Sequence, residues 1–240
     1  MGLKSAFVVL RRILAVVLIG CSGVASAAMV SFNDVALDGI FSQASFGGYN
    51  IDIRFNSPLS VVAPSLLSID SNEEFSGPAP SLSALANQLQ IPNFTVSLFY
   101  VDQISFCGAT GSNIIGCGSS GGGLIALKSA AAAGTNGAAL LAHELGHNLG
   151  LDHLSSSENL MNSSITGATL LTTTQVGKFL NLSTGQPINP IVQNDNGQLY
   201  ISITPIAVLA AVPEPQTWAM LCLGLVGIAA WARRRRAWAG

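Results

Sequence analysis

HELGHNLGLDH, residues 143–153, contains all three histidines of the 240-residue chain. On an α-helix, residues four positions apart lie on one face, so His143 and His147 can present imidazole nitrogens to a single metal ion. Catalytic zinc takes three protein ligands and keeps a fourth position for water, which makes His153 the third candidate ligand. For His153 to reach back, the helix has to end after His147, and Gly150 tolerates the left-handed conformation of a helix end. The spacing therefore predicts one catalytic zinc site.

The pattern HExxHxxGxxH resembles that of the metzincin metalloproteases, and the residues around it are similar to the matrixin and the adamalysin/reprolysin branches. The resemblance implies an α+β fold, with a twisted, mostly parallel sheet, a backing helix and an active-site helix above a small C-terminal subdomain. It also implies a methionine turn beneath the metal, and Met161 in the segment 159–162 fits that role. Leu154 stands where matrixins usually have serine, and the cysteine-bearing segment usual in adamalysins is missing, so the branch stays open.

The activity implied by this resemblance is that of a secreted zinc endopeptidase acting on protein or peptide substrates. Glu144, next to His143, would be the general base that takes a proton from metal-activated water and later passes it to the leaving amine. The alternative is a noncatalytic binding protein of the cell surface or exopolysaccharide matrix with a structural zinc site. A structural calcium ion is left open, because the sequence assigns it no ligands.

Residues 1–27 have the pattern of a signal peptide. Lys4, Arg11 and Arg12 precede the apolar run 13–20, and the small residues 25–27 suit cleavage by signal peptidase after Ala27. The segment 18–21 also resembles a bacterial lipobox, which would leave a lipidated Cys21 as the mature N-terminus. Both alternatives predict export.

Residues 212–240 combine a Pro-Glu-Pro motif at 213–215, an apolar helix over 218–232 and the arginine cluster 233–236. At 1.5 Å per residue this helix covers only about 22 Å, short of the roughly 30 Å hydrocarbon core, so it is a marginal transmembrane helix. The order of features resembles the PEP-CTERM sorting signal of Gram-negative bacteria. That resemblance implies transient insertion in the inner membrane, removal of the tail by an exosortase-type enzyme, and delivery to the cell surface or extracellular matrix. A permanent tail anchor with a basic cytoplasmic end is the alternative.

The region between these two ends is acidic. Residues 28–212 contain three Lys and Arg residues against eleven Asp and Glu residues, a net charge of −8. A surface so poor in cations binds phosphate weakly, so nucleic acid is not expected as a partner. Its length suits one domain with a core of its own.

Cys107 and Cys117 are the only cysteines between the two ends. An exported protein meets an oxidising compartment, where this pair can close a small glycine-rich loop as a disulfide. Two free thiols are the alternative. Neither cysteine is expected as a zinc ligand, because the three histidines complete the protein's share.

Hydrophobic periodicity and turn residues place the regular elements of the domain, which we expect over residues 28–182. We expect strands over 50–55, 94–101 and 124–127, a helix over 82–89 that begins at Ser81, an active-site helix capped by Asn136, and a C-terminal helix over 172–182. Residues 183–211 are expected to be an extension or spacer with a hairpin around 194–197.

Leu124, Ile125, Ala126 and Leu127 lie just before the active-site helix, where the resemblance places an edge strand that pairs with extended substrate. A plain buried strand is the alternative. The propeptide cysteine that keeps matrixins latent is missing. The enzyme is therefore either active after export or blocked by residues 28–48, with Asp34 or Asp38 as the blocking ligand.

Overall fold

A computed structural model describes residues 27–211, 221, 223–228 and 231. The compact unit is Ala25–Ala210, and the tail residues belong to a second unit. Residues 1–26 of the expected signal peptide, with Cys21, and residues 218–220, 222, 229, 230 and 232 of the expected tail helix lie outside the described residues. Residues 221, 223–228 and 231 are helical. No helix within the described part of the chain combines the length and apolarity needed to cross a membrane.

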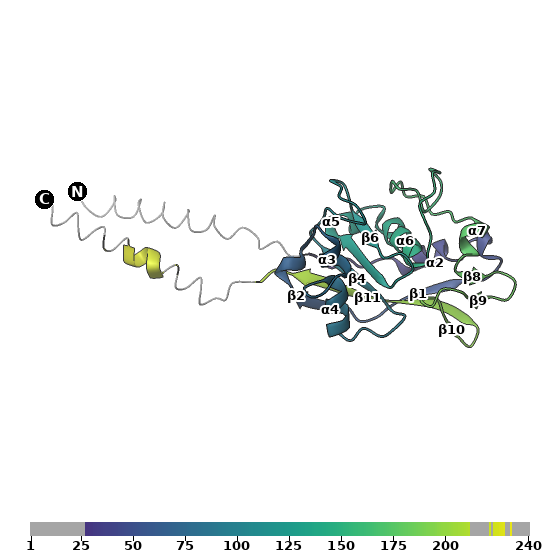
Figure 1. Cartoon of the computed structure of the whole chain (residues 1–240), viewed down its shortest axis with the longest axis horizontal. Coiled ribbons are helices and arrows are strands. Elements are labelled where there is room, and N and C mark those ends of the chain that lie inside the picture. Colours follow the sequence, from purple (N-terminus) through teal and green to yellow (C-terminus); the bar gives the residue numbers. More distant parts are fainter. Residues whose placement is uncertain (1–26, 212–220, 222, 229–230, 232–240) are drawn as a thin grey trace. The chain divides into compact units, whose positions relative to one another are not determined.

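A seven-stranded sheet forms the centre of the compact unit (Figure 1). Its main strand order is β1-β11-β4-β7-β6, and β2 and β10 also pair with β11. All pairs are parallel except β6 with β7 and β10 with β11. The predicted α+β class with a mostly parallel sheet is therefore confirmed. The strands are β1 (Ile51–Phe55), β2 (Leu59–Val62), β4 (Val96–Val101), β6 (Gly116–Gly118), β7 (Leu124–Lys128), β10 (Gln193–Asp195) and β11 (Gln198–Leu209).

Helices cover both faces of this sheet. Helices α2 (Asp34–Ile40) and α6 (Gly137–Asn148) pack on one face, and α3 (Asn72–Ser76) and α4 (Leu82–Gln88) on the other. Each face of the sheet therefore carries its own apolar core. The side chains of β4 alternate between these two cores, and all six of its residues are buried. This double burial explains why 94–101 is so rich in β-branched and aromatic residues.

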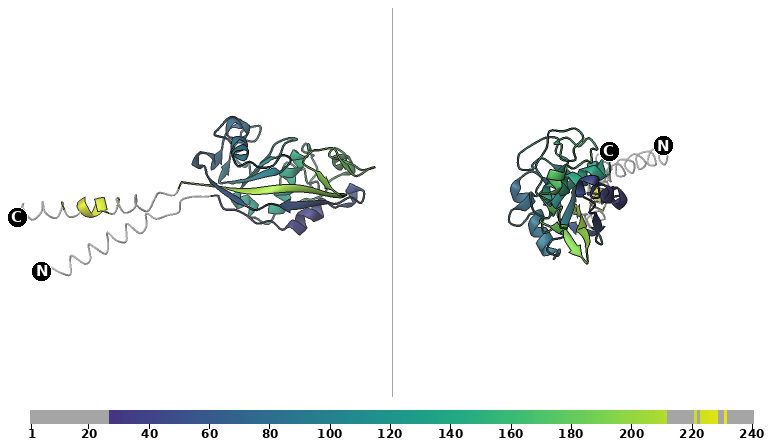
Figure 2. Two further views of the ribbon diagram at one scale, coloured as in Figure 1. Left: turned by 90° about the horizontal axis from the view of Figure 1, so that it is seen from below. Right: turned by 90° about the vertical axis from the view of Figure 1, so that its right-hand side faces the viewer.

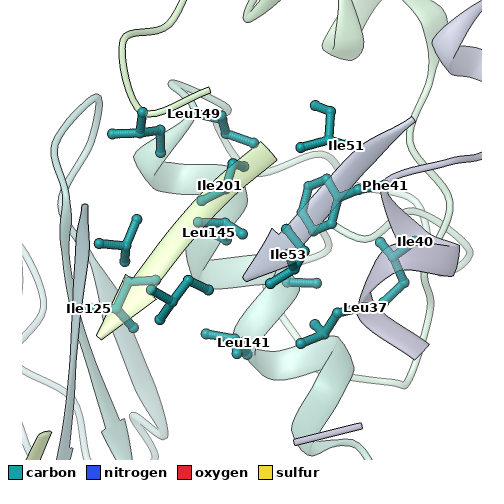
Figure 3. Close-up of a cluster of buried hydrophobic side chains, with 14 of the residues drawn as sticks. Leu37, Ile40, Phe41, Ile51, Ile53, Ile125, Leu141, Leu145, Leu149 and Ile201 are labelled. Carbon is teal, nitrogen blue, oxygen red and sulfur yellow. The ribbon is translucent and has the colours of Figure 1, made fainter. Parts of the chain in front are cut away.

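The core beneath α6 fixes the active-site helix against the sheet (Figure 3). Leu141 and Leu145 lie one turn apart on α6 and belong to the same buried cluster as Ile125 of β7 and Ile201 of β11. The cluster continues to α2 and β1. The helix that carries two of the three histidines is thus held by a large apolar contact.

Two of the predicted helix starts are found where the sequence placed them. The Ser81 hydroxyl caps α4 by accepting a hydrogen bond from the Ala84 amide. Asn136 is the N-cap residue of α6, but its side chain makes no capping hydrogen bond. The remaining short elements are η1 (Ala44–Phe46), η2 (Pro64–Leu66), α5 (Ser129–Ala132), α7 (Thr173–Val176), the parallel pair β3 (Ser68–Ile69) and β5 (Gln103–Ile104), and the antiparallel pair β8 (Leu180–Asn181) and β9 (Gln186–Pro187).

The segment 183–211 is not a spacer, and the domain boundary expected at residue 182 is wrong. Strand β11 runs along the sheet as its long yellow-green strand (Figure 2) and pairs in parallel with β1 on one side and β4 on the other. Leu199, Ile201 and Ile203 are buried in the core beneath α6. Strands β10 and β11 form a hairpin whose turn, Asn196-Gly197, has positive φ at both residues.

The expected helix over 172–182 is reduced to the single turn of α7. Thr172 and Gln175 form a capping box at its start, and Gly177 is its C-cap residue. Phe179 and Leu180 are fully buried, and Leu180 already belongs to β8. Pairing of β8 with β9 takes the place of further helical turns.

Residues 124–127 do not form the edge of the sheet. Strand β7 lies between β4 and β6, so both of its sides are already paired, and Leu124, Ile125, Ala126 and Leu127 are buried. The expectation that these residues pair with substrate is therefore wrong. The edge is β6, a three-residue strand with too little alternation to be recognised in the sequence.

Residues 34–41 are built into the core of the fold. Leu37 and Phe41 are fully buried in the core beneath α6. The Asp38 carboxylate accepts a hydrogen bond of 2.8 Å from the Ile53 amide, and the Asp34 carboxylate accepts one from the Val35 amide. Both proposed blocking ligands are thus engaged with backbone amides.

Candidate metal centre

Helix α6 ends at the point that brings its two histidines together with the third. Gly150 has φ +83°, and the amides of Gly150 and Leu151 donate to the carbonyls of His147 and Gly146, at 2.9 Å each. This is the Schellman arrangement of a helix C-terminus, which requires a left-handed residue. The chain therefore turns back after α6, as predicted from Gly150.

His143, His147 and His153 converge as the spacing predicts. One potential ligand atom of each lies within 4.8 Å of the others, and the Nε2 atoms of His147 and His153 are 3.2 Å apart. Two nitrogens on one tetrahedral zinc ion at about 2.0–2.1 Å would lie roughly 3.3 Å apart. The donor set and this separation both fit zinc.

Backbone carbonyls orient two of the imidazoles. The Nδ1 atom of His143 is 2.8 Å from the Leu160 carbonyl oxygen, and that of His147 is 2.9 Å from the Leu151 carbonyl oxygen. Because a carbonyl only accepts, each Nδ1 carries the proton and each Nε2 keeps a lone pair for a metal.

Exposure rises across the triad from His143, which is buried, through His147 to His153, which is exposed. Burial lowers the pKa of His143 to about 4, and repulsion from the other two rings contributes further. Burial also lowers the pKa of His147. Neutral imidazoles are the form that binds a metal, and the exposed side of His153 leaves the site open to solvent.

Met161 is fully buried and packs against α6 at Gly146. A Cβ atom added at Gly146 would collide with the Met161 sulfur, so glycine allows this close approach without a shift of the methionine. Met161 directly follows Leu160, whose carbonyl orients His143. The methionine thus lies under the same turn of helix that carries His143 and His147.

Glu144 lies against the edge strand β6. Its side chain is buried and accepts a backbone hydrogen bond from Gly118, and a Cβ atom added at Gly116 would collide with its carboxyl group. Burial raises the pKa of this carboxyl to about 8, although the Gly118 hydrogen bond opposes the shift. The close approach of Glu144 therefore explains why residues 116 and 118 of β6 are glycines. In the sequence, the two glycines that flank Cys117 were the available signal of this contact.

The edge strand is tied to its surroundings by a disulfide bond and by hydrogen bonds to the loop that follows it. The predicted disulfide between Cys107 and Cys117 is present, with a Cα–Cα distance of 5.5 Å. Beyond β6, the buried Asn148 amide donates to the Gly122 and Leu124 carbonyls, and the Gly121 amide donates to the His147 carbonyl. Sequence reasoning did not identify Asn148, whose position inside the histidine segment was the available signal.

Residues 64–176 match the family model of the matrixins, a range that contains the three histidines and Met161. This part of the chain is therefore similar to the matrixins. The match begins after β1 and ends before β11, so the first and last strands of the sheet lie outside it.

Residues 211–236 match the PEP-CTERM protein-sorting motif. This motif indicates export and sorting in a Gram-negative-type cell and implies processing by an exosortase. Searches of curated proteins and of solved structures found no match to the chain.

The match to the matrixin model and the histidine triad together support a zinc metallopeptidase. Among the described residues, the triad is the only cluster of three or more His, Cys, Asp or Glu side chains arranged to hold a metal. Calcium, which the sequence left open, gains no support.

Proposed function

We propose that this protein is an exported zinc endopeptidase in which His143, His147 and His153 hold the metal and Glu144 is the general base. The observation that carries the proposal is the convergence of three imidazoles, two of them on the helix that also carries the Glu144 carboxyl group. A bound zinc ion supplies Lewis acidity, which polarises a peptide carbonyl and acidifies water, and its charge favours the ionised form of Glu144.

The residues of the chain then have distinct tasks. Leu160 and Leu151 hold the imidazoles of His143 and His147 in the tautomer that leaves Nε2 free. Glu144 takes a proton from the attacking water at a carboxylate oxygen and returns it to the leaving amine nitrogen. No side-chain nucleophile is required, so no acyl-enzyme forms.

Strand β6 is the proposed docking site for the substrate backbone. It pairs with β7 on one side, and no other strand of the described chain pairs with it. An extended peptide could add a strand to the sheet along this unpaired side of β6. Because Glu144 lies directly against β6, such a peptide would pass beside the general base.

The two ends of the chain supply the proposed address. Signal peptidase would cut after Ala27, and the tail would insert in the inner membrane until an exosortase removes it. The sorting motif supports this route, which leaves the catalytic domain at the cell surface or in the extracellular matrix. The proposed substrates are therefore proteins or peptides outside the cytoplasm.

Exchange of Glu144 for Gln tests the catalytic role. Gln keeps the size of the side chain but cannot take the proton, and a positioned general base contributes about 10²–10⁴-fold to the rate. We expect casein cleavage by the zinc-loaded protein to fall by at least about 10²-fold while one zinc ion remains bound. Glu158→Gln, at an exposed position in the following loop, is the matched control and should keep full activity.

Cleavage that persists in Glu144→Gln would exclude Glu144 as the base. A wild-type protein that binds zinc and cleaves no peptide would instead favour the noncatalytic surface or matrix role.

A further inference from the structure

Two facing carboxamides lie beneath the metal centre. The Asn159 side chain is buried and donates from Nδ2 to Gln175 Oε1 at 2.8 Å, while Gln175 donates from Nε2 to Asn159 Oδ1 at 3.0 Å. Asn159 lies in the loop before Met161, and Gln175 lies in α7. The pair thus joins two segments that are sixteen residues apart.

One peptide group connects this pair to the first histidine. The Met161 amide donates to Asn159 Oδ1 at 2.9 Å, and the carbonyl of the same peptide group, that of Leu160, accepts from His143 Nδ1 at 2.8 Å. A peptide group is planar and rigid, so fixing its N–H also fixes the direction of its C=O. The path runs from Gln175 through Asn159 and the Leu160–Met161 peptide to the imidazole.

We propose that Asn159 and Gln175 are positioning residues for the metal site, which set the orientation of His143 through the Leu160–Met161 peptide. This inference rests on the proposed zinc site. Hydrogen bonds in series polarise one another, and partners of metal-bound histidines commonly affect metal affinity. The pair would therefore act on zinc affinity without touching the ion.

His147 provides an internal comparison, because a different carbonyl orients its imidazole. His147 is oriented by the Leu151 carbonyl at the end of its own helix, and Leu151 is held by the Gly146 carbonyl. That arrangement does not involve Asn159 or Gln175. A loss of either carboxamide should consequently disturb His143 and leave the orientation of His147 unchanged.

Gln175 also serves α7, so the test must separate its two roles. Its Oε1 accepts from the Thr172 amide at 2.9 Å in the capping box, whereas its Nε2 donates to Asn159. Gln175→Glu keeps an oxygen for the capping box and replaces only the donor that faces Asn159 Oδ1. Gln175→Leu removes both roles, and the half-buried position tolerates either side chain.

Gln43→Leu is the matched control. The Gln43 side chain bonds to the Thr169 carbonyl at 2.5 Å and to the Leu171 amide at 3.3 Å, so it fastens the same loop without contacting the Leu160–Met161 peptide. If looseness of that loop were the cause of weaker binding, Gln43→Leu would weaken zinc binding as much as the changes at residue 175.

The experiment measures zinc dissociation constants of the full chain by competition with a chelator, together with NMR hydrogen exchange of the histidine Nδ1 protons. We expect both Gln175 variants to bind zinc about tenfold more weakly, at the lower end of the effect of such partners. The Nδ1 proton of His143 should exchange faster in both, with that of His147 unchanged. Gln43→Leu should bind zinc as the wild type does.

Wild-type affinity in both Gln175 variants, or an equal loss in Gln43→Leu, would overturn the inference while leaving the zinc site intact. Failure of the wild-type protein itself to bind zinc would instead refute the proposed function.

Discussion

A chain that ends after Leu182 should not fold, although it contains the whole histidine segment. The missing part includes β11, whose five large aliphatic side chains Leu199, Ile201, Ile203, Ile206 and Val208 are all buried. Burial of one such side chain contributes about 1.5–3 kcal/mol, so the strand supplies roughly 8–15 kcal/mol. This is comparable to the roughly 5–15 kcal/mol by which domains are stable. Loss of β11 also leaves β1 and β4 without their shared partner.

Urea unfolding followed by circular dichroism measures this effect. The chain shortened to residue 182 should give no cooperative transition, whereas a chain ending at residue 211 should unfold in one step. Ile203→Ala in the longer chain should cost about 2–5 kcal/mol, and Ser202→Ala, at the partly exposed neighbouring position, less than about 1 kcal/mol. A cooperative transition of near-normal stability in the shorter chain would refute the placement of β11.

The remaining predictions concern α6 and its surroundings. Gly146→Ala should destabilise the protein by about 1–3 kcal/mol, because its methyl group meets the Met161 sulfur. Gly39→Ala, at an open position on α2, should raise stability by up to about 1 kcal/mol. Thermal melts of the two variants and the wild type measure both changes. In the metal-free protein, burial raises the pKa of Glu144 from an ordinary 4.5 to about 8, so the folded state keeps a proton that the unfolded state loses. The stabilising contribution of this protonated carboxyl should therefore be lost as pH rises from about 5 to about 8, whereas the lowered pKa values of His143 and His147 act in the opposite direction below about 6.5. Net stability should fall between about pH 6.5 and pH 8, and Glu144→Gln should remove that fall in urea titrations. An unchanged slope in that variant would contradict the burial of the carboxyl.

The metal centre could be predicted from the sequence because its ligands are local. His143 and His147 share one helix face, Gly150 ends that helix, and His153 follows three residues later, so the helix and its C-terminal turn bring them together. Strand β4 was predictable for a similar reason, since burial on both faces leaves a run of mostly apolar residues interrupted only by Ser97.

The order of strands could not be predicted in the same way. The pattern of residues 198–209 predicts a strand, but nothing within it selects β1 and β4 as its partners. The edge of the sheet was missed because Gly116 and Gly118 have no side chains to alternate, and their reason is the close approach of Glu144. Contacts between distant segments decided both cases.

The amide pair beneath the metal escaped prediction for the same physical reason. Asn159 and Gln175 are polar residues in loop-like sequence, where exposure to solvent is the usual expectation. Only the packing of α7 against the loop before Met161 makes them partners. The part of the site that orients a ligand was thus less visible in the sequence than the ligands themselves.

Zinc K-edge absorption of the purified full chain, with its metal content, tests the central claim most directly. We expect one zinc ion per chain, with three histidine nitrogens at about 2.0–2.1 Å and one further oxygen ligand. His143→Ala should abolish the stoichiometric metal. A folded wild-type protein without stoichiometric zinc, or with zinc bound through ligands other than these three imidazoles, would contradict the account.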